Sequence, residues 1–178
     1  GDLIQTLNEL DVAIEGEGFI QVSMPNGNTG YTRSGALKRD SNGRLTTSDG
    51  YPIIPAITLP DGSRQITISD SGIVSAIIGA DTNSTEIGTI ELASFTNNSG
   101  LSAIGKNLFN ETAASGTPQT GTPGSDGYGT LLQTYLEGSN VNIVEELASM
   151  ITTQRAYEIN SKTIQTSDEM MQTTNNLI

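Results

Sequence analysis

The sequence contains no cysteine, no histidine and no tryptophan. Without cysteine there is no disulfide, no thiol nucleophile and no thiolate metal site, and without histidine the commonest general base and metal ligand is missing. These absences exclude many classes of enzyme. We therefore expect a protein that is not an enzyme, with no catalytic residue, no bound cofactor and no metal ion.

Basic residues are also scarce, since eight Lys and Arg stand against twenty Asp and Glu and give a net charge of −12. Binding to a phosphate backbone requires clustered cations, so we expect no nucleic acid partner. No apolar run reaches the length of a membrane span, and the start lacks the charged-then-apolar pattern of a cleaved leader, so we expect no membrane insertion. The chain opens on Gly1 rather than Met, and we expect further sequence upstream.

Aromatic residues make up 4% of the chain, whereas there are 20 glycines. A modest core must therefore come from Val, Ile and Leu on short elements. Turn signals separate short runs of strand formers and predict hairpins with two-residue loops; they are Asn26-Gly27, Asn42-Gly43, Asp49-Gly50, Asp61-Gly62 and Ser71-Gly72.

The spacing of these signals, roughly ten residues, predicts a mainly β domain built as a meander, sandwich or barrel. We place this outer domain at residues 10–101, after a lead-in segment at 1–9, with Thr89–Phe95 as its last alternating strand. Residues 102–141 are rich in Gly, Pro and Thr, with isolated apolar anchors. Such anchors predict an irregular strap that lies over another surface rather than a free linker.

Residues 142–178 contain no Pro or Gly and predict one long C-terminal helix. Asn142 is an N-cap residue, and Glu145 three positions later completes a capping box. Apolar residues recur every seven positions, as in a coiled coil, at Ile143, Met150, Tyr157, Ile164, Met171 and Ile178. The matching second seam begins with Leu147 and then becomes polar, so a simple two-stranded zipper is disfavoured.

This apolar edge is too narrow to stabilise so long a helix alone. Burying a large apolar side chain returns roughly 1.5–3 kcal/mol, whereas ordering each residue of backbone costs roughly 1–2 kcal/mol. We expect a helix that frays in an isolated subunit and becomes ordered between several neighbours. The predicted interface comprises Ile143, Leu147, Met150, Ile151, Tyr157, Ile164, Met171 and Ile178; the alternative is an ordinary helix folded back on the β domain.

Two short motifs have chemical interpretations that we disfavour. Glu15 and Glu17 could pair for acid–base hydrolysis, but alternation on a strand puts both on one solvated face. Asp40–Leu45 lacks the twelve-residue frame and terminal Glu of a calcium loop, so a hairpin turn is the preferred interpretation.

Three stretches together resemble the bacterial flagellar rod and hook proteins: "LNELDVAIEGEGFIQV", "GYTRSGALKRDSNGRLTTSDGYPI" and "LEGSNVNIVEELASMITTQRAYEINSKTI". The resemblance covers nearly the whole chain. It implies a structural subunit of the periplasm-spanning rod, in its distal part, which self-assembles into a helical tube and transmits torque. The hook and the proximal rod are alternatives within the family, and a secreted β-rich binding module is an alternative from another class.

The resemblance also implies the partners and the location. The partners would be copies of the same chain, other rod proteins, the hook protein, and the P-ring and L-ring proteins around the rod. The subunit would be exported before assembly into the basal body. An N-terminal helix, which the sequence from Gly1 onward does not show, would pair with the C-terminal helix, and Tyr157, Ile164 and Met171 would face helices of the same and neighbouring subunits.

Overall fold

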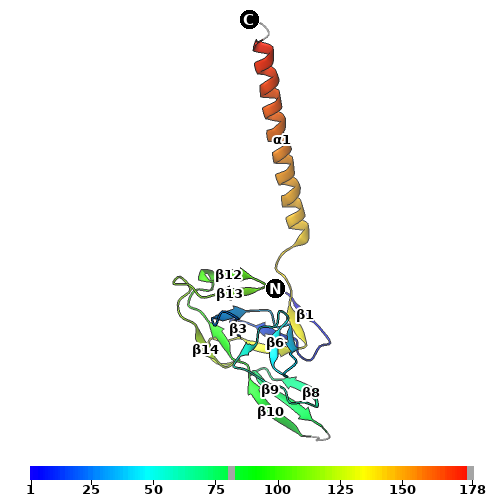
Figure 1. The fold of residues 1–178 in the computed structure, drawn as a ribbon, viewed down its shortest axis with the longest axis vertical. Coiled ribbons are helices and arrows are strands. Elements are labelled where there is room, and N and C mark those ends of the chain that lie inside the picture. The colour runs from blue at the N-terminus through cyan, green and yellow to red at the C-terminus, as the bar shows by residue number, and fades with distance from the viewer. Residues whose placement is uncertain (80–82, 176–178) are drawn as a thin grey trace. The chain divides into compact units, whose positions relative to one another are not determined.

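The computed structural model describes residues 1–79 and 83–175. The chain divides into one unit of residues Gly1–Gly138 and a second of Ser139–Ile178. The first unit consists of short antiparallel strands, and the second contains a single helix, α1 (Ile143–Asn175) (Figure 1). This confirms the predicted class, mainly β with a long C-terminal helix, and the described strands do not close into a barrel.

The largest sheet forms the centre of the first unit. Its strand order is β12 (Ser102–Gly105), β13 (Leu108–Asn110), β4 (Thr29–Thr32), β3 (Phe19–Ser23), β11 (Leu92–Ser94) and β14 (Gln119–Gly121), and β7 (Ile53–Ile54) also pairs with β3. Strand β3 is central because its pairs with β4, β11 and β7 join three separate parts of the chain.

The other strands form smaller antiparallel groups. They are β8 (Ser63–Ile68), β9 (Ile73–Ile78) and β10 (Ser84–Thr89) in one sheet, and the pairs β1 (Leu3–Gln5) with β16 (Tyr135–Glu137), β2 (Val12–Glu15) with β15 (Thr130–Gln133), and β5 (Leu37–Arg39) with β6 (Leu45–Thr47); a single 3-10 turn, η1, covers Asn98–Gly100. In Figure 1 the β8–β10 sheet and the β12–β13 hairpin lie at opposite ends of this unit.

Residues 102–138 supply strands to the same unit as the first hundred residues. Strands β13, β14, β15 and β16 pair with β4, β11, β2 and β1 respectively. The first unit therefore ends at Gly138. It includes both the lead-in segment 1–9 and most of the segment 102–141.

The turns lie where the sequence places them, but their geometry differs from the prediction. The amide of Gly27 donates to the Met24 carbonyl at 3.0 Å, and Gly43, Gly50 and Gly72 make the same bond to the residue three positions earlier. In each turn only the glycine has positive φ, between 81° and 88°, whereas a two-residue type I′ loop needs positive φ at both central residues. These are therefore type I turns followed by a glycine bulge, and the prediction of two-residue loops is wrong.

The predicted single strand Thr89–Phe95 is interrupted. Strand β10 ends at Thr89 and β11 begins at Leu92. Between them Ile90 is buried, and its amide donates to the Gly72 carbonyl at 2.8 Å. The chain thus passes from the β8–β10 sheet to the central sheet within two residues, which a simple alternation of apolar side chains does not reveal.

The core is aliphatic, as the composition predicts. Its main cluster consists of Val12, Ile14, Ile20, Val22, Leu37, Leu45, Ile53, Ile57, Leu59, Ile68, Val74, Ile90, Leu92, Leu108 and Leu131. A second cluster gathers three of the few aromatic residues, where the rings of Phe19 and Tyr31 both pack edge-on against Phe95. Edge-to-face packing is the favoured arrangement of such rings and adds to the stabilisation from burial.

Among the described residues, no helix is both long and apolar enough to cross a lipid bilayer.

Candidate assembly interface

Helix α1 begins where the sequence predicts. The amide of Val144 donates to the Asn142 side-chain oxygen at 3.0 Å, so Asn142 caps the helix. Glu145 and Glu146 lie in the first turn, where carboxylates interact favourably with the positive end of the helix dipole. No reciprocal hydrogen bond joins the Glu145 side chain to Asn142 among the described residues, so the cap forms without the rest of the capping box.

The helix exposes its apolar side chains. The exposed fraction of the predicted interface residues runs from 51% for Leu147 to 78% for Tyr157. The others within this range are Ile143, Met150, Ile151, Ile164 and Met171, whereas Ile178 lies outside the described residues. A monomeric soluble protein rarely exposes so many large apolar groups along one element, so this surface is a candidate for contact with other chains.

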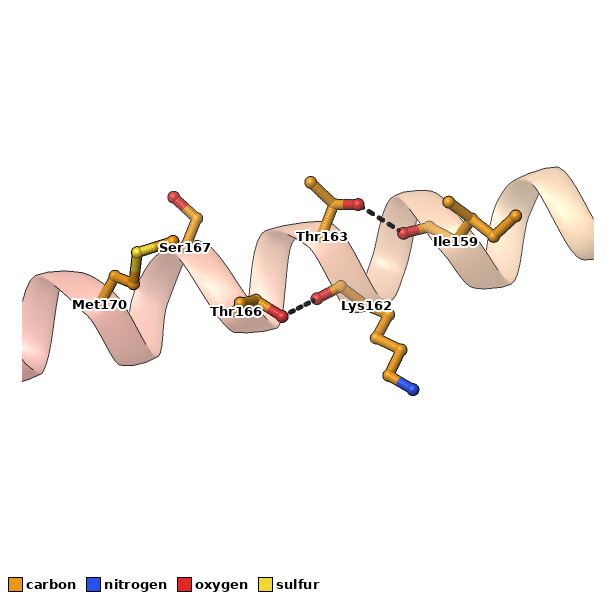
Figure 2. Close-up of a pocket in the computed structure, with 6 residues that line it drawn as sticks. All are labelled: Ile159, Lys162, Thr163, Thr166, Ser167 and Met170. Carbon is orange, nitrogen blue, oxygen red and sulfur yellow. Dashed lines mark hydrogen bonds between the residues drawn. The ribbon is translucent and has the colours of Figure 1, made fainter.

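Several threonines of the helix satisfy their hydroxyl groups within the helix. Figure 2 shows Thr163 and Thr166 donating to the carbonyl oxygens of Ile159 and Lys162, at 2.8 Å and 2.9 Å. The hydroxyls of Thr152 and Thr153 likewise donate to the carbonyl oxygens four residues earlier in the helix. A hydroxyl that is already bonded costs little to bury, because its hydrogen-bonding requirement is already met. These threonines can therefore enter an interface as nearly apolar residues.

A shallow hollow lies along the surface of the helix between the side chains of Ile159 and Met170. It is lined by Ile159, Lys162, Thr163, Thr166, Ser167 and Met170, all from one helix (Figure 2). It is too shallow and too one-sided to enclose a small ligand. A hollow between side chains that stand along one side of a helix has the shape that receives a side chain from a packed neighbouring helix.

The apolar side of the helix changes direction along its length. In the first two turns Ile143, Leu147 and Ile151 lie within about 80° of one another, at about 100° of rotation per residue. Beyond Gln154 the side that continues theirs carries polar groups, including Glu158 and Gln165. This agrees with the sequence, in which the second seam begins with Leu147 and then becomes polar.

The strand that leads to the helix is held by an arginine. Arg33 donates from Nε to Glu137 of β16 at 2.8 Å, and its other nitrogens donate to the carbonyls of Ile14, Gly16 and Gly18 at 3.1–3.2 Å. Partial burial opposes the charged form of Glu137, but hydrogen bonding, including the bond from Arg33, holds its pKa below the usual range. The network fixes the last strand before the chain leaves the first unit at Gly138.

The two disfavoured chemical motifs lie on the surface. Glu15 is the last residue of β2 and Glu17 lies in the loop between β2 and β3, and both are exposed. Asp40 accepts hydrogen bonds from the amides of Asn42 and Arg44 and from the Arg44 side chain, which closes the β5–β6 hairpin. Although desolvation acts in the opposite direction, these bonds lower the pKa of Asp40. Within the described part of the chain, no group of three or more acidic side chains is arranged to hold a metal ion.

A second exposed apolar group lies at the start of the chain. Leu3 and Ile4 of β1 are partly exposed, and Leu7 in the following loop is almost fully exposed. The sequence analysis assigned residues 1–9 to a lead-in segment and did not identify these three side chains as exposed. The apolar residues before the first turn are the sequence signal for this exposed group, but the pattern of apolar and polar residues alone does not distinguish it from a buried strand.

Comparison with known proteins matches both units. A family model described as the flagellar hook protein FlgE/F/G D1 domain matches residues 13–76, and one described as the flagellar basal body rod FlgEFG protein C-terminal matches residues 132–177. The chain is 54% identical over 177 residues to flagellar basal-body rod protein FlgG of Borreliella burgdorferi, which covers 98% of this chain and 67% of the relative.

Two further relatives show how this similarity varies. Flagellar basal-body rod protein FlgG of Buchnera aphidicola subsp. Schizaphis graminum is 53% identical over 172 residues, or 97% of this chain and 66% of the relative. Flagellar hook protein FlgE of Escherichia coli is 38% identical over 134 residues, or 74% of this chain and 31% of the relative. The chain thus spans about two thirds of the length of the two rod relatives, 66% and 67%.

Proposed function

Because the chain belongs to the family of flagellar rod and hook proteins designated FlgE/F/G, we propose that it is a structural subunit of the distal part of the flagellar rod. In this role it polymerises into a helical tube that transmits torque across the periplasm. The role is structural and requires no catalysis and no cofactor.

The observation that carries this proposal is an identity of about half the residues to rod proteins named FlgG, over 97–98% of the chain. The exposed apolar helix supports it independently. A helix of 33 residues is about 50 Å long, and its seam residues expose at least half of their surface. Such a helix gains most of its tertiary stabilisation from neighbouring chains rather than from its own.

We assign the assembly contacts of the helix to Ile143, Leu147, Met150, Ile151, Tyr157, Ile164 and Met171, with Ile178 beyond the described residues. The first unit, Gly1–Gly138, then forms the outer part of the subunit. The proposed partners are copies of this chain, other rod proteins and the hook protein at the rod's end. The P-ring and L-ring proteins would surround the assembled rod, which implies export of the subunit from the cytoplasm.

The hook is the second candidate within the family. The similarity to the hook protein FlgE supports it, but this similarity covers 74% of the chain at 38% identity, compared with 97–98% at 51–54% for three of the rod proteins. The rod is therefore the preferred location. Labelling the subunit in purified basal bodies and locating the label by electron microscopy distinguishes the two, since a label in the hook would overturn the rod assignment.

Removal of residues 142–178 tests the structural role. The truncated chain should remain a folded β unit and should fail to enter rods, because the first unit contains its own core. The matched control is Gln165→Ala, which changes an exposed polar residue of the same helix and should assemble normally. Normal incorporation of the truncated chain into rods would refute the role assigned to the helix.

A further inference from the structure

Strands β8 and β10 form the two edges of the three-stranded sheet in the first unit (Figure 1). An edge strand presents backbone N–H and C=O groups with which a strand of another chain can pair. Strand β10 is interrupted by a bulge between Glu86 and Gly88, and Glu86 is exposed. A bulge and a charge both oppose the addition of a further strand, so the sequence of β10 protects this edge.

The sequence of strand β8 is that of a strand that pairs readily. A bulge lies at its start, but residues 65–68 pair with β9 in a regular register. These four residues contain no Pro, Gly or charge, and three of them are β-branched. A segment of this kind pairs with copies of itself when its backbone is accessible. The edge formed by β8 therefore needs protection from elsewhere in the chain.

Two side chains from distant parts of the chain hold this edge. The Ile66 amide donates to Oε2 of Glu9 at 3.1 Å, and the Ile68 amide donates to Oε1 of Gln133 at 3.1 Å. Nε2 of Gln133 donates in turn to the carbonyl oxygens of Ile66 and Glu9, at 2.8 Å and 2.7 Å. A side-chain amide has the same kinds of donor and acceptor as a peptide group, so Gln133 takes the place of a residue in a fourth strand. We call Glu9 and Gln133 the β8 latch.

We propose that the β8 latch prevents the β8 strand of a second copy of this chain from pairing with this edge. The amide and the carbonyl oxygen of Ile66 both bond to the latch, so they lie on the same outer edge. Facing residues of an antiparallel pair exchange two such bonds. Two β8 strands can therefore pair about Ile66, with Gln65 of one copy opposite Thr67 of the other.

Such a contact is symmetric and closes into a dimer, which cannot extend into an open polymer. The latch thus keeps the free subunit from a contact that would compete with assembly. This inference goes beyond the proposed function, because it concerns the subunit before assembly and does not depend on how the helix packs.

Opening the latch in the full chain tests the proposal. The double variant Glu9→Ala/Gln133→Ala should form dimers at a concentration at which the unsubstituted chain sediments as single subunits. At high dilution, the amides of Ile66 and Ile68 should exchange slowly in the unsubstituted chain and about tenfold faster or more in the double variant. Hydrogen exchange resolved by residue measures this difference.

Two variants serve as controls for this experiment. Gln65→Ala removes the same kind of side chain from an exposed position of β8 itself, and it should leave both the subunit mass and the exchange unchanged. Arg33→Ala removes hydrogen bonds elsewhere in the first unit and should not cause dimers. It separates the effect of the open edge from a general loss of stability.

Cysteine cross-linking identifies the contact, because the sequence contains no cysteine of its own. In the double variant, chains with Gln65→Cys mixed with chains with Thr67→Cys should form a disulfide-linked dimer under oxidation. Each cysteine chain alone samples a neighbouring register of the two strands. The same chains with an intact latch should remain single. Thr67→Lys added to the double variant should also restore single subunits, since a charge on an edge strand opposes pairing.

Four results would overturn the proposal. Rapid exchange at Ile66 and Ile68 in the unsubstituted chain would show that the latch does not hold the edge. A double variant that stays single, or that dimerises without a cross-link in any of the three registers, would show that β8 is not the contact. Dimers of Arg33→Ala would assign the association to lost stability. The proposed function fails separately, if the chain without residues 142–178 enters rods.

Discussion

Replacing Tyr157 by alanine separates the stability of the subunit from the stability of the assembly. The side chain is 78% exposed in the single chain, so its removal deletes almost no packing there. Alanine also has a higher helix propensity than tyrosine, so the helix itself is not weakened. The unfolding free energy of the first unit should therefore change by less than about 0.5 kcal/mol, as for an ordinary surface substitution.

The effect on assembly should be much larger. If the tyrosine becomes fully buried between neighbouring helices, its removal costs roughly 1.5–3 kcal/mol of contact free energy. At about 1.4 kcal/mol per factor of ten, the concentration of free subunit in equilibrium with polymer should rise about 10- to 150-fold. Sedimentation of assembled from free chain measures this concentration, and urea unfolding of the free chain measures the subunit stability.

The matched control is Gln165→Ala, on the polar side of the same helix. It should leave both measurements unchanged. An unchanged assembly concentration in Tyr157→Ala would place this side chain outside the interface. A loss of subunit stability above about 1 kcal/mol would mean instead that the tyrosine packs within its own chain.

Three further predictions concern the first unit. Arg33→Ala removes four side-chain hydrogen bonds and should lower the unfolding free energy in urea by roughly 2–4 kcal/mol, whereas a loss below about 0.5 kcal/mol would show that the network is not stabilising. The pKa of Glu137 is lowered in the folded state, so its stabilisation is present above its ordinary value of 4.5 and is lost as the pH falls through the lower folded value. The stability deficit of Glu137→Gln should thus narrow below pH 4.5, and a deficit that widens there contradicts this sign. Gly72→Ala should cost roughly 1–3 kcal/mol, because the residue has φ of 83° and a Cβ would lie 2.5 Å from the Ile90 carbonyl oxygen; an unchanged thermal midpoint would refute that strain.

Local patterns predicted much of the fold. The Asn-Gly and Asp-Gly pairs placed the hairpins, because few residues other than glycine adopt positive φ without cost. The cap at Asn142 and the lack of Gly and Pro placed the helix. These patterns could not predict the type of each hairpin turn, because the conformation of the residue before each glycine depends on how the two strands twist.

Long-range pairing was beyond the reach of these patterns. Strand β15 pairs with β2 more than a hundred residues away, with Leu131 opposite Ile14, and no local signal specifies this register. The hydrogen bonds of Arg33 likewise join three segments that are separate in sequence, around residues 14–18, at Arg33 itself and at Glu137. On the helix, the heptad frame identified the ridge of Tyr157 and Ile164, whereas the exposed Met170 lies outside its seven-residue repeat.

The central claim is that helix α1 is completed by other copies of the chain. Amide hydrogen exchange, followed by mass spectrometry on the isolated full chain and on the assembled polymer, tests it most directly. We predict rapid exchange along residues 143–175 in the isolated chain and strong protection of the same residues in the polymer. Full protection of the helix in the isolated chain at high dilution would contradict the account.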